Sequence, residues 1–218
     1  MEQTRKIGLL EFNLTSFIWC LTLPVVAFVL VLSLGPVLNV NNLGSPLSRE
    51  SLSQFLQYYN SHMVNEGLQI FLNNFTAVLV MVYFTPLALG IRQIWEKWRC
   101  RKVSISVFEK NLLFLFPGLF LIRQAINVAL VLNNFSANIN KSVVVTLAGI
   151  ILPHGLPELI SFSLAGAVGM EVTRKLLFSS STGKLVGLKE LGLLLFLTAS
   201  CAFLEVFLTP RVFMLLMS

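Results

Sequence analysis

The stretch PHGLPE at residues 153–158 lies inside an apolar run that extends from Val143 to Met170. A run of this length is long enough to cross a lipid bilayer as a helix. It brings a histidine, a carboxylate and two prolines to a depth where ionisable groups and unpaired backbone are costly. The rest of the fold must compensate these groups, and the residues that do so are the first candidates for function.

The composition is that of an integral membrane protein. Only 12% of the 218 residues are charged and 56% are hydrophobic, and the mean hydropathy is +0.80. Soluble proteins, by comparison, carry about 25% charged residues. The net charge of +6 does not indicate nucleic-acid binding, because the basic residues gather in two segments rather than along one face. We therefore expect no nucleic-acid partner and a protein surrounded mainly by the bilayer.

Five apolar runs predict an all-α bundle of five transmembrane helices, which forms a single domain over residues 1–218. The runs are Leu14–Val37, Leu68–Ile91, Asn111–Leu132, Val143–Met170 and Glu190–Met217. Basic residues are abundant in the segments 92–110 and 171–189 and rare in the other connections. The positive-inside rule therefore places these two segments and the N-terminus in the cytoplasm, and the C-terminus outside.

The segment 38–67 is the predicted outer loop of the bundle. Ser48 is typical of a helix N-terminus, and apolar residues then recur at helical spacing from Leu52 to Tyr59. This pattern predicts an amphipathic helix that lies on the outer membrane interface or covers the mouth of the bundle.

Pro153 and Pro157 predict a break in the fourth span over residues 153–157. Neither proline can donate a backbone hydrogen bond, and Gly155 between them adds conformational freedom. Unwound backbone at membrane depth is tolerated only where it is buried in protein or lines a cavity. We expect the freed carbonyl groups to face a polar cluster inside the bundle.

One face of the fourth span is both polar and small. His154, Glu158, Ser161, Ala165 and Gly169 follow one another at steps of three or four residues, which places them on a single helical stripe. Small residues at this spacing allow another helix to approach closely. The stripe is therefore expected to point into the bundle and not toward lipid.

Polar residues in the other spans are candidate partners for this stripe. Glu205 in the fifth span and Arg123 with Asn127 in the third span are expected near the middle of the bilayer, at the depth of His154 and Glu158. Asn73 and Asn74 in the second span lie closer to the outer surface and are expected to hydrogen-bond between helices.

His154, Glu158 and Glu205 form the candidate metal site, because one histidine and two carboxylates suit a divalent cation of borderline softness. Three interpretations stay open: a polar network that fixes the helix register, an ion or proton site, and a hydrolytic centre with metal-activated water. No second histidine completes a zinc-protease motif. We assign no catalytic residue from the sequence, and a non-enzymatic role is favoured.

Three stretches resemble the signature of the stage II sporulation protein M family of polytopic membrane proteins. They are LPHGLPE at residues 152–158, FLNN at residues 71–74 and AFLEVFLTP at residues 202–210. The resemblance covers the chain from about Leu68 onward. The chain departs from the family pattern at Pro157, before the glutamate, and at Arg123 in the third span.

This resemblance implies a multi-pass protein of a prokaryotic plasma membrane. In endospore formers the namesake acts in a complex with cell-wall-degrading enzymes that remodel peptidoglycan during engulfment, which implies a membrane scaffold without catalytic activity. The favoured hypothesis is therefore a scaffold for other membrane or extracytoplasmic proteins, cell-wall hydrolases among them, and a second copy of the chain is a further candidate partner. The alternatives are an ion- or proton-translocating protein and an intramembrane metal-dependent hydrolase.

Overall fold

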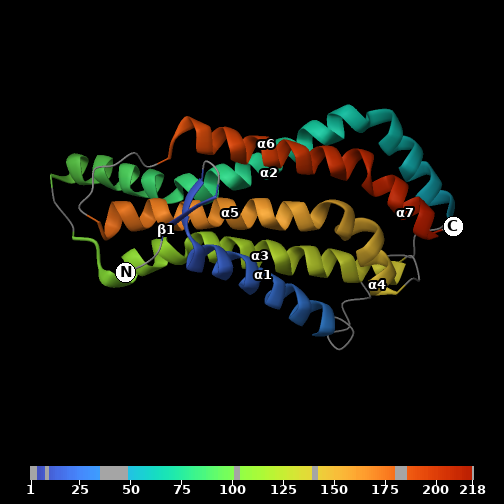
Figure 1. Cartoon of the computed structure of the whole chain (residues 1–218), viewed down its shortest axis with the longest axis horizontal. Coiled ribbons are helices and arrows are strands. Elements are labelled where there is room, and N and C mark those ends of the chain that lie inside the picture. The colour runs from blue at the N-terminus through green and yellow to red at the C-terminus, as the bar shows by residue number, and fades with distance from the viewer. Residues whose placement is uncertain are drawn as a thin grey trace.

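The computed structural model describes residues 4–7, 10–34, 49–100, 104–138, 142–179 and 186–217. Its helical segments are α1 (Leu14–Leu34), α2 (Arg49–Arg99), α3 (Val107–Asn138), α4 (Val143–Thr146), the π-helical η2 (Leu147–Ile151), α5 (Leu152–Leu177), α6 (Leu188–Phe207) and α7 (Thr209–Met217) (Figure 1). The predicted helical membrane bundle is confirmed. The described part contains four helices long and apolar enough to span a membrane, or five spans if the bent pair around η2 counts as one.

Two short strands that were not predicted precede α1. β1 (Thr4–Ile7) and β2 (Leu10–Asn13) pair antiparallel, with Thr4 opposite Asn13 and Ile7 opposite Leu10. The side-chain oxygen of Asn13 accepts a hydrogen bond of 2.8 Å from the backbone N–H of Thr15. This contact caps the first turn of α1, so Asn13 ends the strand and begins the helix. Strands of four residues are too short to be recognised from their alternation.

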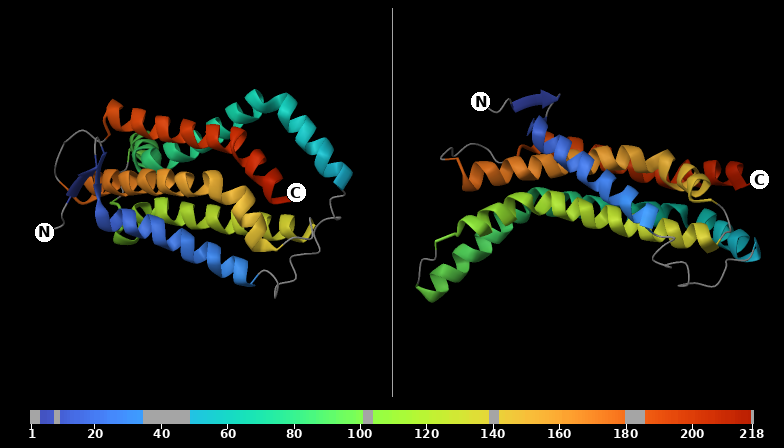
Figure 2. Two further views of the ribbon diagram at one scale, coloured as in Figure 1. Left: turned by 45° about the vertical axis from the view of Figure 1, so that its right-hand side comes forward. Right: turned by 90° about the horizontal axis from the view of Figure 1, so that it is seen from below.

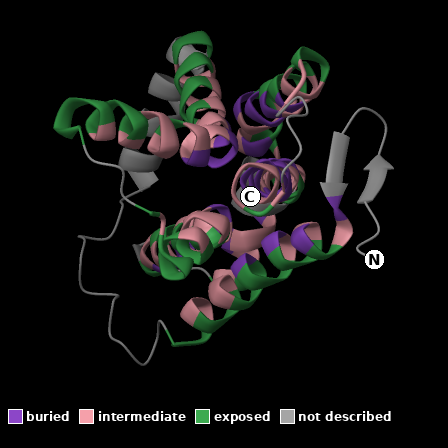
Figure 3. Ribbon diagram, turned by 90° about the vertical axis from the view of Figure 1, so that its left-hand side faces the viewer, coloured by how far each residue is buried: buried purple, intermediate pink, exposed green. Residues whose placement is uncertain are grey.

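α5 is the central helix of the bundle and packs against α1, α2, α3 and α6 (Figures 1 and 2). Most of its side chains between Ser161 and Thr173 are buried, and Figure 3 shows the buried residues facing the inside of the bundle. A helix surrounded on all sides must carry apolar or small residues all round. The alanines and glycines between Ala165 and Gly169 meet this requirement.

α5 and α2 approach each other closely at Gly169. A Cβ atom at this position would overlap the backbone carbonyl of Met81. One turn further along, Thr173 donates a hydrogen bond of 2.9 Å to the Gly169 carbonyl, and its hydroxyl oxygen lies 2.7 Å from that of Thr85. Since a hydroxyl has one hydrogen, Thr85 is the donor to Thr173. The two buried hydroxyls are thereby satisfied across the α2–α5 contact.

α2 and α3 are longer than the predicted spans. α2 includes the helix expected after Ser48 and continues through Arg99, into the basic segment 92–110. Charged residues support helix there, because Arg92 and Glu96 pair at 3.0 Å four positions apart. Residues 38–48 lie outside the described residues, as do the side chains of residues 49–63, so the amphipathic face predicted for the outer loop remains a prediction.

Different segments of the chain lie at the two ends of the bundle. The N-terminus, the end of α2, the start of α3 and the end of α5 lie at one end, which we call the arm end (Figure 1). α4 and α7 lie at the opposite end, which we call the α7 end. Both segments predicted to be cytoplasmic belong to the arm end. That this end faces the cytoplasm and the C-terminus faces outside remains a prediction.

The chain changes direction before Pro153 and not within residues 153–157. Helices Val143–Gly149 and Pro153–Leu177 meet at 74°, with η2 between them, and α5 continues through Pro157. The predicted position of the break is corrected accordingly. Pro153 is the second residue of α5 and directly follows the π-helical η2, where the regular α-helical bonding has already changed, so its missing N–H does not interrupt α5.

Candidate functional site

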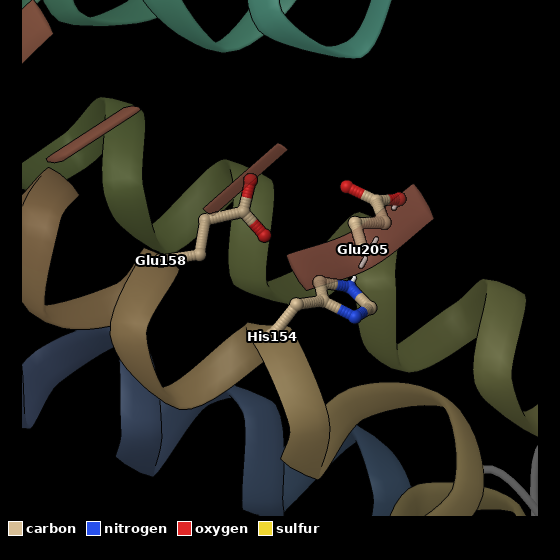
Figure 4. A group of neighbouring side chains, drawn as sticks. All are labelled: His154, Glu158 and Glu205. Carbon is tan, nitrogen blue, oxygen red and sulfur yellow. Dashed lines mark ion pairs between the residues drawn. The ribbon is translucent and has the colours of Figure 1, made fainter. Parts of the chain in front are cut away.

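Three ionisable side chains meet between α5 and α6 near the α7 end (Figure 4). His154 and Glu158 lie in the first two turns of α5, and Glu205 lies in the last turn of α6. His154 Nε2 is 4.0 Å from Glu205 Oε1, and one ligand atom from each of the three residues lies within 4.8 Å of the others. The structure therefore brings together the three residues of the candidate metal site, while metal binding remains a prediction.

The imidazole of His154 is buried and oriented by α7. Its Nδ1 atom lies 2.8 Å from the hydroxyl oxygen of Thr209, the first residue of that helix. In the tautomer in which Nδ1 donates to Thr209, the lone pair of Nε2 is directed toward Glu205. A hydrogen bond on the far nitrogen is the usual way in which proteins orient a histidine that binds a metal through the other nitrogen.

α2 contributes a fourth polar residue to the site. Asn74 Nδ2 donates a hydrogen bond of 2.5 Å to Glu158 Oε1, which agrees with the expectation that the paired asparagines bond between helices. Asn73 is exposed and does not join the site. The charged groups come from α5 and α6 and their hydrogen-bond partners from α2 and α7, so four helices meet here.

Glu158 and Glu205 have no ion pair with an arginine or lysine in the described part of the chain. The buried carboxylate of Glu171, further along α5, is different, because Arg174 donates two hydrogen bonds of 2.7 and 2.9 Å to it. A buried carboxylate that keeps its charge requires such a partner. Among the described residues, no arginine or lysine neutralises Glu158 and Glu205, and a proton or a bound cation would do so.

Arg123 was expected to help neutralise this cluster, and the structure does not bring it there. Arg123 and Asn127 lie on an exposed face of α3, whereas Leu121 and Ala129 are buried. Residues two positions apart are separated by a rotation of about 200° around the helix axis. Arg123 therefore points away from the core, because Leu121 faces it. The depth of a residue follows from its position in a span, but its direction depends on the rotation of the helix.

Ser161 supplies a further sign of a ligand. Ser161 is 2% exposed, and its hydroxyl oxygen has no hydrogen-bond partner among the described residues. It follows Glu158 by one turn on the same face of α5. A buried hydroxyl without a protein partner is normally satisfied by a bound water or ion.

The site lies toward the α7 end of the bundle, because His154 is the third residue of α5 and Glu205 is two residues before the end of α6. That it lies near the middle of the bilayer remains a prediction. Thr209 follows Glu205 by four residues. Its contact with His154 was not predicted, because it depends on the turn at Leu208, where α6 ends and α7 begins.

A family model described as Stage II sporulation protein M matches residues 16–210. A search of curated proteins and a search of solved structures each found no match. The matched range contains all the residues that meet at the site, namely Asn74, His154, Glu158, Ser161, Glu205 and Thr209.

Proposed function

Because this chain belongs to the stage II sporulation protein M family of membrane proteins, we propose that it is a non-enzymatic scaffold that positions envelope-remodelling proteins in a prokaryotic plasma membrane. In this proposal a divalent cation held by His154, Glu158 and Glu205 fixes the α7 end, where extracytoplasmic partners bind. The observation that carries the proposal is the convergence of these three side chains without an arginine or lysine partner among the described residues.

The chemistry of the three side chains favours a cation. Two carboxylates held close together in a medium of low dielectric constant repel each other, and either a shared proton or a cation relieves this repulsion. An imidazole nitrogen beside the carboxylates adds a ligand that protonation alone would not require. Nitrogen and oxygen ligands together suit Zn²⁺ or Mn²⁺ better than Mg²⁺ or Ca²⁺, which prefer oxygen alone.

The arrangement of the ligands supports a structural role for this cation. It would join α5 to α6 directly, and α2 and α7 through Asn74 and Thr209. If both carboxylates bind the cation, the three-residue group contains no further carboxylate to act as a general base for metal-activated water. This disfavours the hydrolase among the alternatives.

The packing of α5 between the site and the arm end disfavours ion translocation. Along the stripe of α5 that carries His154 and Glu158, Ala165 is fully buried and Gly169 lies directly against the backbone of Met81. From Ser161 toward the arm end, this face of α5 is therefore packed against its neighbours. A cation at this site would be held near one end of the bundle, as a structural role requires.

The proposal is tested by purifying the full-length protein in mild detergent and assaying the preparation for peptidoglycan hydrolysis. We expect hydrolase activity to co-purify with the unaltered protein and to be lost with His154→Ala or after chelation. Glu109→Gln, which removes an exposed carboxylate at the arm end, is expected to retain it. The proposal would be contradicted if the chain hydrolysed peptidoglycan when produced without other envelope proteins. It would also be contradicted if chelation left the amount of co-purified hydrolase activity unchanged.

Thr209→Val is expected to weaken cation binding by about ten- to a hundredfold, because partners that orient a ligating histidine contribute this much to metal affinity. Valine preserves the shape of threonine but cannot form the hydrogen bond with His154 Nδ1. Thr209→Ser keeps the hydroxyl and should retain the affinity for the cation. Competition with a zinc-binding dye measures the effect. Thr22→Val on the exposed face of α1 is the control, and equal affinity in all three variants would refute the orienting role of Thr209.

A further inference from the structure

At the arm end, the hairpin of α2 and α3 bends away from the other helices (Figure 2). Each helix carries one internal proline, Pro86 in α2 and Pro117 in α3. Their neighbours Phe84 and Phe116 stack with ring centroids 3.6 Å apart, so the two prolines lie at the same level. A proline inside a helix removes a hydrogen bond and bends the helix. We call residues 86–100 and 104–117, beyond these bends, the arm.

The arm exposes an apolar stripe on α2. Ile91, Ile94, Trp95 and Trp98 follow one another at helical spacing, and their exposed fractions are 68%, 70%, 51% and 76%. Arg92 lies on a different side of the helix and turns toward α3, where it donates a hydrogen bond of 3.1 Å to the carbonyl of Ser104. The stripe therefore does not mediate the contact between the two helices of the arm.

Basic residues lie beside the aromatic part of this stripe. Lys97 and Arg99 are exposed, and the guanidinium carbon of Arg99 lies 4.4 Å from the centre of the Trp95 ring. The rings of Trp95 and Trp98 are 5.7 Å apart. Tryptophans next to lysine and arginine are typical of helices at the membrane interface, where the rings enter the headgroup region and the cations meet anionic lipid.

The length of α2 places the arm beyond the hydrocarbon core. The candidate membrane span in α2, Val64–Arg99, has 36 residues, which corresponds to about 54 Å of helix. The hydrocarbon core is about 30 Å thick, a distance that the 20 residues of α6 already cover. Near the α7 end, Gly67 of α2 lies against Val206, one residue before the end of α6. The excess length of α2 therefore lies at the arm end, and while α6 spans the core the last turns of α2 lie at the membrane surface or outside it.

We propose that the arm lies on the membrane surface and binds the phosphate groups of anionic phospholipids through Lys97 and Arg99. The stripe of Ile91, Ile94, Trp95 and Trp98 enters the headgroup region of the same leaflet. The bends at Pro86 and Pro117 allow the arm to lie along the surface while the rest of α2 and α3 crosses the membrane. This inference does not depend on the cation site or on the scaffold role.

The test uses the full-length protein with Trp19→Phe, which leaves Trp95 and Trp98 as the remaining tryptophans of three. The protein is reconstituted into brominated phosphatidylcholine, alone or with phosphatidylglycerol, because bromine quenches tryptophan fluorescence only on contact. We expect strong quenching that requires phosphatidylglycerol and weakens with salt. Lys97→Gln and Arg99→Gln should each lower the ratio of bilayer-inserted to free arm by about fivefold.

Lys189→Gln is the matched control, because it removes an exposed basic residue at the same end of the bundle but outside the arm. Its quenching should equal that of the parent protein, and all variants should melt at the same temperature. Quenching that is equal with and without phosphatidylglycerol would overturn headgroup binding. Quenching that is absent in both bilayers would also overturn it, and would leave the stripe for a protein partner.

Discussion

Gly169→Leu should lower the free energy of unfolding by at least about 3 kcal/mol, the upper part of the range for overpacked cores. The first carbon of any side chain at this position overlaps the backbone carbonyl of Met81. A backbone carbonyl cannot rotate aside as the end of a flexible side chain can, so α5 and α2 must move apart. Their separation would also break the buried hydroxyl pair of Thr85 and Thr173. Thermal unfolding in detergent measures the loss.

Gly192→Leu provides the matched control for this prediction. Gly192 is exposed on α6, and a Cβ atom there would meet nothing within 4 Å, so the change should stay within about 0.5 kcal/mol. Gly169→Ala should fall between the two leucine variants, because it introduces the overlapping atom but no further bulk. If Gly169→Leu melts like Gly192→Leu, the two helices do not approach as closely as described.

Glu158→Gln or Glu205→Gln should abolish the stabilisation that Zn²⁺ or Mn²⁺ confers on the protein. A cation at a hundred times its dissociation constant stabilises a protein by about 2.7 kcal/mol, and each substitution removes one of the two carboxylate ligands. Glutamine preserves size and can still accept a hydrogen bond from Asn74. The readouts are the melting temperature with increasing cation and the metal content after purification.

Glu109→Gln is the control for this experiment, because Glu109 is exposed at the start of α3, far along the chain from the site. It should retain the full response to the cation. A Glu158→Gln variant that keeps its metal content but melts much lower would show that the glutamate stabilises a polar network without a cation. The first of the three interpretations raised from the sequence would then be correct.

Several features of this protein could be read from the sequence alone because they are local properties of the chain. Hydropathy over a window of span length identifies the membrane helices, and the spacing of His154 and Glu158 places them on one helical face. The requirement that buried ionisable groups be compensated singles out Glu205 as a partner. The small residues around Gly169 likewise predict a close helix contact on that face.

The lengths of the helices and the position of the break were less predictable. α2 continues into the basic segment because charged residues such as Arg92 and Glu96 support helix as well as apolar ones do. Pro153 and Pro157 indicate that regular bonding is disturbed, but α5 begins immediately before Pro153 and continues through Pro157. The bend therefore falls before Pro153, where η2 joins α4 to α5.

Only the tertiary structure decided which polar residues meet. Asn74 and Thr209 reach Glu158 and His154 from α2 and α7, whereas Arg123, expected at a similar depth, is exposed on α3. These outcomes depend on the rotation of each helix about its axis and on its offset along its neighbours. Both are set by packing between helices far apart in the chain, and the pattern within a single span does not contain them. The sequence by itself thus determined the membrane-helix class and the candidate residues, and packing determined the site.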